Sequence, residues 1–222
     1  MSLVSEFLTI DSNVDDGVDV ELEVKRSRFL TRLRRVTSEE TARAVVDERR
    51  SRFFDARHHC SAFILGPEGR TSRSSDDGEP AGTAGVPMLT VLTSNHLTDV
   101  VAVVTRYFGG IKLGAGGLVR AYSEAVAHAV AAVGTRRVEL CTLLRIDADF
   151  ANIGMLENSL RGAVLPSGVN VTVEGVDWGD RARITVAVPV TATGEFNAFL
   201  SALSAGSLTA HPTGQRWVDR LG

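Results

Sequence analysis

The 222-residue chain contains only two cysteines, and this scarcity excludes several kinds of protein. Cys60 and Cys141 lie far apart and outside any C-x-x-C motif, so we expect neither a disulfide framework nor a structural zinc site. Chains with so little cysteine are typical of reducing compartments, and the cytoplasm is the simplest expectation.

The sequence also lacks an early basic cluster and any long apolar run. Residues 1–17 are polar and acidic, which argues against a signal peptide and predicts a frayed arm or an edge strand. The longest apolar stretches, Val100–Val104 and Ala125–Val133, fall well short of the roughly 20 residues that a membrane span requires. We therefore expect no membrane partner.

The sequence also lacks a large excess of either charge, because the formal net charge is only -3. Any binding of nucleic acid must then come from a local patch. Such a patch is present in Lys25–Arg57, where eleven Lys or Arg residues face five Asp or Glu residues. Its aromatic residues are few (Phe29, Phe53 and Phe54), so salt-sensitive phosphate contact is a more plausible mode than base stacking.

Part of this surplus is expected to be neutralised within the protein. Residues 18–25 and 28–36 alternate between apolar and polar side chains and predict two strands. If these strands form a hairpin, opposite charges share one face and pair across it. The groups concerned are Asp19, Glu21 and Glu23 on the first strand, and Arg28, Arg32 and Arg34 on the second.

The remaining pattern predicts two α+β domains, one at 1–135 and one at 138–222, joined by a linker at Thr135–Val138. In the first, a capping box at Thr37–Glu40 begins a helix. Strands follow at 59–65, 70–74 and 99–107, and helices at 87–93 and 118–134. The second reads as a ferredoxin-like βαββαβ motif. Its predicted elements are 140–148, 151–161, 169–176, 181–190, 194–205 and a short last strand near Leu208.

A glycine-rich loop between a strand and a helix is the strongest candidate for a binding site. Its glycines are Gly109, Gly110, Gly114, Gly116 and Gly117, and three cations flank them: Arg106, Lys112 and Arg120. Amides at the start of the following helix carry partial positive charge and suit an anion such as a nucleic-acid phosphate. The spacing fits neither a Walker loop nor a dinucleotide fingerprint, and a tight corner alone is the simpler alternative.

A second loop, Ser75–Gly85, carries three carboxylates: Asp76, Asp77 and Glu79. They suit Mg²⁺ or Ca²⁺, or an acid–base pair, but they equally suit a solvated turn in which Thr83 caps the next helix. Nearby, His58 and Cys60 share one face of a strand and His59 points the other way, so a zinc site is not expected. We assign no metal site, no cofactor and no catalytic residue.

Three long strings around these loops resemble the IMPACT/YigZ family: DARHHC at 55–60, SDDGEPAGTAGVPM at 75–88 and VTRYFGGIKLGAGGLVRAY at 104–122. The resemblance implies a first domain like the second domain of ribosomal protein S5. It also implies a second domain like the fifth domain of elongation factor G. Its motif positions fall on eight candidate binding residues: Arg57, His58, Asp76, Asp77, Glu79, Arg106, Lys112 and Arg120.

The resemblance also directs the functional hypotheses. Both implied domain types recur in proteins that touch RNA or the ribosome, and eukaryotic relatives act in translational control through a protein partner. The leading hypothesis is therefore a binding protein, rather than an enzyme, that contacts RNA or the ribosome and modulates translation. One alternative is a metal-assisted hydrolase or phosphotransferase that uses Asp76, Asp77 and Glu79. Another is a protein-interaction adaptor.

Overall fold

The computed structural model describes residues 4–11 and 18–220, and it shows a two-domain α+β protein built on antiparallel sheets. One compact unit holds Phe7–Arg137, and the other holds Val138–Arg220 together with the residues before Phe7. Within the described residues, no helix has the length and apolar character needed to cross a membrane.

The first unit is organised around a five-stranded sheet in the order β2-β3-β6-β4-β5, with every neighbouring pair antiparallel. The predicted strands are confirmed to within a residue or two. Their bounds are β2 (Val18–Val24), β3 (Ser27–Arg35), β4 (His58–Leu65), β5 (Thr71–Ser75) and β6 (Val100–Tyr107).

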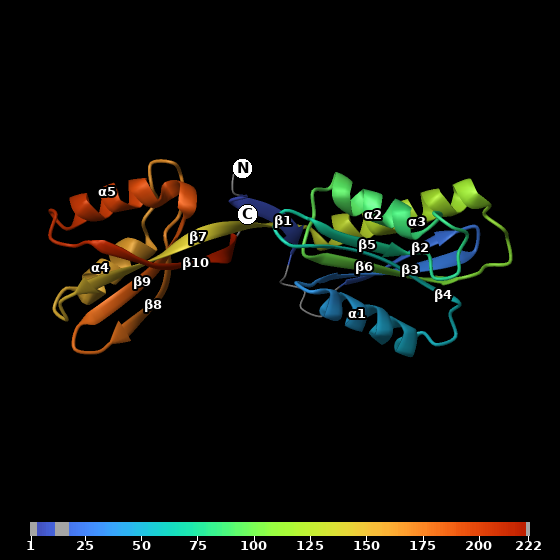
Figure 1. The fold of residues 1–222 in the computed structure, drawn as a ribbon, viewed down its shortest axis with the longest axis horizontal. Helices are drawn as coiled ribbons and strands as arrows, with labels where there is room; N and C mark the ends of the chain where they lie inside the picture. Colours follow the sequence, from blue (N-terminus) through green and yellow to red (C-terminus); the bar gives the residue numbers. More distant parts are fainter. Residues whose placement is uncertain (1–3, 12–17, 221–222) are drawn as a thin grey trace. The chain divides into compact units, whose positions relative to one another are not determined.

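Helices cover both faces of this sheet, as Figure 1 shows. Helices α2 (Gly85–Ser94) and α3 (Ala115–Val133) pack on one face, and α1 (Glu39–Arg52) packs on the other. Successive side chains of β6 point to opposite faces, so Val101 faces α1 and Ala102 faces α3. Burial on both faces explains why this strand is a continuous apolar run.

Helix α1 starts one residue later than its predicted capping box. Ser38, not Thr37, is the N-cap, and its hydroxyl accepts the amide of Thr41 at 3.2 Å, while the Ser38 amide donates to the Thr41 hydroxyl at 3.3 Å. Just before the helix, the amide of Val36 donates to the carbonyl of Asp99 at 3.0 Å.

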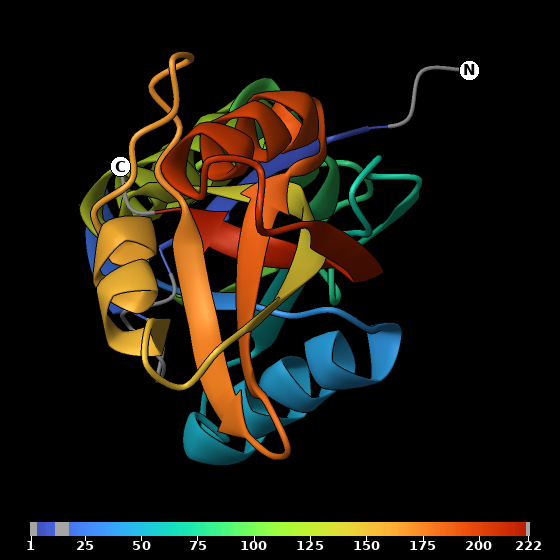
Figure 2. The same cartoon turned by 90° about the vertical axis from the view of Figure 1, so that its left-hand side faces the viewer.

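The second unit has the predicted element order, with a 3-10 turn (Val190–Ala192) before its second helix. Strand β7 lies between β9 and β10, and β8 pairs with the outer side of β9. Figure 2 looks onto this unit, with the β8–β9 hairpin in orange and both helices beside it. The elements are β7 (Thr135–Ala148), α4 (Ile153–Arg161), β8 (Thr172–Trp178), β9 (Ala182–Pro189), α5 (Thr193–Leu203) and β10 (Ala210–Arg220).

Two segments differ from what the sequence pattern predicts, and a third decides between two predicted alternatives. Thr135–Val138, read as a linker, is the beginning of β7, and the last strand is eleven residues long instead of a short piece near Leu208. Pro212 and Gly214 are unfavourable inside a strand, so the sequence pattern did not predict the full length of β10. Both residues are tolerated because β10 pairs with β7 alone and is an edge strand. In the acidic N-terminus, β1 (Glu6–Ile10) is a strand, whereas residues 12–17 lie outside the described part.

Candidate nucleic-acid interface

Four connections meet at one end of the first unit's sheet, which we call the loop end. They are the β2–β3 turn (25–26), the segment before β4 (53–57), the acidic loop (76–84) and the glycine-rich loop (108–114). The antiparallel registers bring them together, because they set the start of β3 and of β4 against the end of β6. The loop end lies at the right of Figure 1.

A buried ion pair joins the two loops singled out from the sequence. Arg106 Nη1 lies 2.6 Å from Glu79 Oε1, and their side chains are only 7% and 3% exposed. The hydroxyl of Tyr122 donates to the same oxygen at 2.8 Å. Arg106 Nη2 donates to the Ser27 hydroxyl at 3.4 Å, and this hydroxyl also accepts the Gly109 amide at 3.2 Å. The network therefore connects both loops to β3 and α3.

This geometry changes the role we assign to Arg106. The sequence suggested a cation beside a surface anion, but the guanidinium is enclosed with Glu79 as its charged partner. The rings of Phe29 and Phe108 lie 5.5 and 5.8 Å from it. A buried guanidinium that is already paired is a poor contact for an external phosphate. We therefore assign Arg106 to fixing the loops in place.

The carboxylate of Asp76 caps helix α2, a role that one alternative gave to Thr83. Its Oδ1 accepts the amides of Ala84 and Gly85 at 3.0 and 2.8 Å, and its Oδ2 accepts the Gly82 amide at 2.8 Å. Burial alone would raise the pKa of Asp76, but these three amide hydrogen bonds lower it below the ordinary value. The Thr83 hydroxyl donates instead to the carbonyl of Pro80.

Asp77 is also directed into the protein. One carboxylate oxygen lies 2.7 Å from Arg50, the other accepts the His59 amide at 2.7 Å, and the Asp77 carbonyl bonds to the His58 ring at 2.9 Å. The three loop carboxylates thus turn toward three different sets of partners. Among the residues that the structure describes, no three His, Cys, Asp or Glu side chains are grouped to hold a metal.

His59 and Cys60 of β4 are buried and hydrogen-bonded on opposite faces of the strand. His59 forms a 3.0 Å hydrogen bond with the Thr105 hydroxyl, and burial lowers its pKa. On the other face, the Cys60 thiol lies 3.3 Å from the Tyr122 hydroxyl, and burial raises the pKa of Cys60 to about 12. A thiol in this state is not a nucleophile at neutral pH.

Most of the loop glycines serve the local fold, but one does not. A Cβ on Gly109 would lie 2.0 Å from the carbonyl carbon of Arg26, so no other residue fits there. A Cβ on Gly116 would meet nothing closer than the Arg120 guanidinium at 3.8 Å. Positive φ or close packing accounts for the other three: Gly110, Gly114 and Gly117.

The N-terminus of α3 faces solvent. Gly114 is its N-cap and supplies no side-chain cap, and residues 114–116 are exposed. The first intrahelical bond runs from the Leu118 amide to the Gly114 carbonyl at 2.9 Å. The amides of the first turn precede this bond, so they are available to an anion at the positive end of a 19-residue helix.

Exposed cations without partners lie at the loop end and on the first turns of α3. They come from the β2–β3 turn, the segment before β4, the glycine-rich loop and the first turns of α3. Within the described part of the chain, none of their side chains forms a hydrogen bond or an ion pair. The five residues are Lys25, Arg26, Arg57, Lys112 and Arg120.

The other cations of Lys25–Arg57 are mostly paired, and the expected neutralisation across the hairpin is confirmed for Arg28 with Glu21 and Arg32 with Asp19. Asp19 contacts the fully buried Arg49 at 2.8 Å and Arg32 at 3.6 Å. The same pattern continues across the face that carries α1. Its pairs are Arg28–Glu21, Arg34–Glu48, Arg43–Glu39 and Arg50–Asp77. The surplus positive charge therefore concentrates at the loop end.

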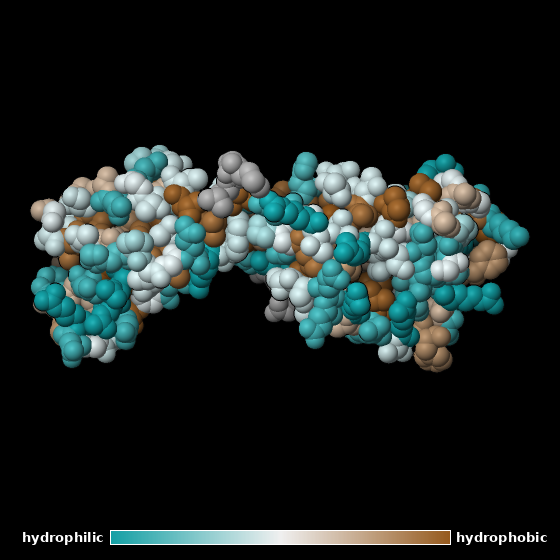
Figure 3. Space-filling model, in the orientation of Figure 1, coloured by the Kyte–Doolittle hydropathy of each residue, from teal (hydrophilic) through white to brown (hydrophobic). Residues whose placement is uncertain are grey.

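Two exposed aromatic residues also lie at the loop end, and sequence reasoning missed one of them. Phe54 is 85% exposed and Phe108 57% exposed, and each is next to one partner of the 2.7 Å hydrogen bond from Tyr107 to Asp55. Figure 3 shows hydrophobic residues among hydrophilic ones at this end of the unit. Phe108 follows the last residue of β6 and precedes two glycines, but this position in the sequence does not show whether another element covers the ring.

The part of the chain that forms these loops matches a known family. Residues 25–130 match the model described as the Impact N-terminal domain. The Escherichia coli protein IMPACT family member YigZ is 38% identical over 193 residues, which cover 86% of this chain and 92% of that protein. The chain belongs to the IMPACT family.

A second relative and a solved structure are also similar to large parts of the chain. IMPACT family member YvyE of Bacillus subtilis is 43% identical over 148 residues, covering 67% of this chain and 68% of YvyE. A crystal structure titled as that of a hypothetical protein is 35% identical and covers 96% of this chain and 99% of its own, with a TM-score of 0.60. The two-domain fold is thus shared with a solved structure over nearly the full length.

Proposed function

We propose that this IMPACT family protein binds RNA, alone or within the ribosome, through the loop end of its first unit, and thereby modulates translation. The observation that carries the proposal is the open N-terminus of α3 together with five exposed cations, at the loop end and on the first turns of α3, that have no side-chain partner within the described residues. Lys and Arg contacts supply most of the affinity of proteins for nucleic-acid backbones, and helix N-termini bind phosphates directly.

The contrast with the rest of the surface gives this argument its weight. Most other Arg residues of the first unit lie within 4 Å of a carboxylate, as in Arg34–Glu48. With a net charge of -3, the protein has no general attraction for polyanions. Only a local group of free cations, such as Lys112 with Arg120, can then attract phosphates.

The exposed rings favour single-stranded RNA over a duplex. Phe54 and Phe108 offer faces on which unstacked bases can lie, and such stacking contributes about 1–3 kcal/mol per base. The bases of a duplex are not accessible to stacking of this kind. Phe108 also lies over the Arg106 guanidinium, which holds the ring from its inner side.

The finer domain assignments are part of this proposal. We propose that the first unit is like the second domain of ribosomal protein S5, and that the second is ferredoxin-like, resembling the fifth domain of elongation factor G. The β-α-β-β-α-β order and the strand order β10-β7-β9-β8 support the latter. We propose domain bounds of 1–135 and 138–222. A role in translation would also place the protein in the cytoplasm.

The test is an RNA-binding titration against salt with matched charge variants. Fluorescence anisotropy of a labelled single-stranded oligonucleotide is followed for the wild type, for Lys112→Ala/Arg120→Ala, and for Arg34→Ala/Arg43→Ala as the control. The first variant loses two unpaired cations, so the slope of log K against log salt should fall by about 1.4. The control loses the same charge from ion-paired positions and should keep the slope.

Two further arms extend the test. Phe108→Ala should weaken binding to the single strand more than to a duplex, and sedimentation with ribosomes should show the same ranking of variants. Binding that ignores salt, or that falls equally in both double variants, would show that the loop end is not the RNA site.

A further inference from the structure

A second exposed surface lies in the other unit, at the end of its β8–β9 hairpin. The rings of Phe150 and Trp178 are stacked, with centroids 6.1 Å apart and an interplanar angle of 9°. They are nevertheless 53% and 62% exposed, and Met155 on α4 is 76% exposed. Large apolar side chains that gather on a surface mark interaction sites more often than they stabilise a fold.

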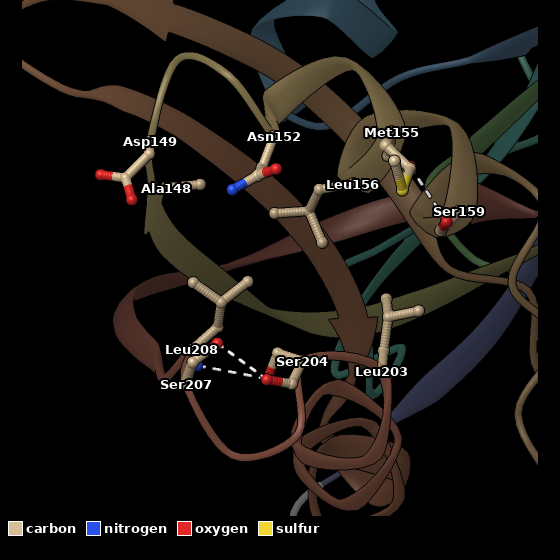
Figure 4. Close-up of a pocket in the computed structure, with 10 residues that line it drawn as sticks. All are labelled: Ala148, Asp149, Asn152, Met155, Leu156, Ser159, Leu203, Ser204, Ser207 and Leu208. Carbon is tan, nitrogen blue, oxygen red and sulfur yellow. Dashed lines mark hydrogen bonds between the residues drawn. The ribbon is translucent and has the colours of Figure 1, made fainter.

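A pocket adjoins this aromatic pair. Its volume is about 310 Å³, and it lies between α4 and the segment that connects α5 to β10 (Figure 4). Leu156, Leu203 and Leu208 supply apolar walls, while Asp149 and Asn152 bring a carboxylate and an amide. Asp149 lines the pocket and directly precedes Phe150 in the loop after β7, so the pocket and the aromatic pair are neighbours along the chain.

The charges around this surface favour a cationic ligand. The region Val138–Arg220 holds six Arg or Lys residues and nine Asp or Glu residues. At the hairpin end, Arg183 bridges Asp147 and Asp177 at 3.6 and 3.8 Å. Asp149 and Asp180 have no side-chain hydrogen bond or ion pair within residues 4–11 and 18–220. Arg181, which follows Asp180 in the chain, also has no side-chain partner within these residues, so two available carboxylates stand against one available guanidinium and a net negative charge remains.

We propose that this surface binds an arginine-containing segment of a protein partner. A guanidinium group is planar and weakly hydrated, so it stacks on exposed rings such as Trp178 and pairs with a carboxylate such as Asp149. The aliphatic stem of a neighbouring side chain fits the leucine walls of the pocket. RNA is the less favourable occupant here, because the free carboxylates repel phosphate.

The experiment measures binding of labelled peptides to the full-length protein at low salt. The probes are a peptide of alternating Arg and Ser and its counterparts with Lys or Glu in place of Arg. The variants are Trp178→Ala and Asp149→Asn. The control Asp47→Asn removes one exposed carboxylate from the first unit, so it tests whether binding follows net charge alone.

We expect the Arg peptide to bind more tightly than the Lys peptide, and the Glu peptide not to bind. Trp178→Ala should weaken the Arg peptide about tenfold, through loss of a cation–π contact. Asp149→Asn should weaken it severalfold, Asp47→Asn should leave it unchanged, and Trp178→Phe should restore most of the affinity. Because Trp178 is exposed, the unfolding midpoint should not move in these variants.

Three results would overturn the proposal. If Asp149→Asn and Asp47→Asn weakened binding of the Arg peptide equally, the affinity would depend on net charge and not on this surface. Arg-peptide affinity that is unchanged in Trp178→Ala would remove the aromatic pair from the site. A labelled single-stranded RNA that loses affinity in Trp178→Ala, while the Arg peptide does not, would identify nucleic acid as the occupant instead. None of these readouts depends on the cations of the loop end.

Discussion

Arg106 and Glu79 form an ion pair with an N–O distance of 2.6 Å, and both side chains are almost completely enclosed. Through this pair the acidic loop is attached to the end of β6, next to the glycine-rich loop that leads into α3. The hydroxyl of Tyr122 adds a third contact to the same carboxylate. The loop end therefore owes its shape to a buried polar network, and the exposed cations are positioned by it.

Removing either member of this pair should destabilise the first unit strongly. Glu79→Ala leaves a buried guanidinium without its counter-charge, and breaking a buried pair in this way costs about 3–5 kcal/mol. Arg106→Ala should cost a similar amount, because it leaves a buried carboxylate. Urea unfolding followed by circular dichroism measures the free energy of unfolding of each variant.

A double variant measures the interaction between the two side chains, apart from what each contributes alone. In Glu79→Leu/Arg106→Leu no uncompensated charge remains, so its loss of stability should be smaller than the sum of the two single losses. Strictly additive losses would show that the two side chains act independently and would contradict the network.

Asp76 should make the stability of the protein sensitive to acid. Because the folded state lowers the pKa of Asp76, its contribution is complete above the unfolded pKa of about 3.9 and is lost as pH falls through the folded pKa. Asp76→Asn removes the charge that accepts the amides of Gly82, Ala84 and Gly85. The gap in unfolding free energy between wild type and Asp76→Asn should be widest near neutral pH and should narrow below about pH 4. Parallel curves would exclude Asp76 as an acid-sensitive cap.

His59 should contribute a separate pH dependence at higher pH. Burial lowers its pKa, so the unfolded state binds more protons between the two pKa values. Its contribution to stability is complete above about pH 6.5 and declines as pH falls from there toward the folded pKa. His59→Gln keeps a hydrogen-bonding group for Thr105 but does not titrate, so its stability curve should be flatter over this range. Imidazole chemical shifts measured against pH give the folded pKa directly.

The sequence predicted the strands of the first unit because alternation and apolar runs are local signals. It also predicted which charges of the hairpin share a face, since that follows from the two-residue period of a strand. The direction of each loop carboxylate was not predictable in this way. Asp76, Asp77 and Glu79 are adjacent in the chain, yet their partners lie on a helix terminus, on α1 with β4, and on β6 with α3.

The same reason explains why the candidate site in the structure omits Arg106 and includes Phe108. Arg106 and Lys112 look equivalent in sequence, since both flank the glycine-rich loop. Only long-range packing decides that Arg106 is enclosed with Glu79 while Lys112 stays exposed, with no side-chain partner in the described part of the chain. The exposed Phe108 was missed for the opposite reason, because local pattern cannot show that no other element covers a residue.

Two glycines of the same loop should respond in opposite ways to alanine. Gly109→Ala forces a Cβ to within 2.0 Å of the Arg26 backbone, so it should destabilise the protein by about 3 kcal/mol. Gly116 lies in the first turn of α3, where a Cβ meets only the end of the flexible Arg120 side chain at 3.8 Å. Gly116→Ala should therefore stabilise the helix, by up to about 1 kcal/mol. Urea unfolding of the two variants tests both signs.

Gly116→Ala also tests how close the RNA backbone comes to the helix terminus. The fold has space for a side chain at this position, so a methyl group there interferes only with a ligand that approaches the first-turn amides. If phosphate docks on these amides, the variant should be more stable than wild type and yet bind single-stranded RNA less tightly in the anisotropy assay. Unchanged affinity, together with the expected gain in stability, would show that the unpaired cations hold the RNA without help from the helix terminus.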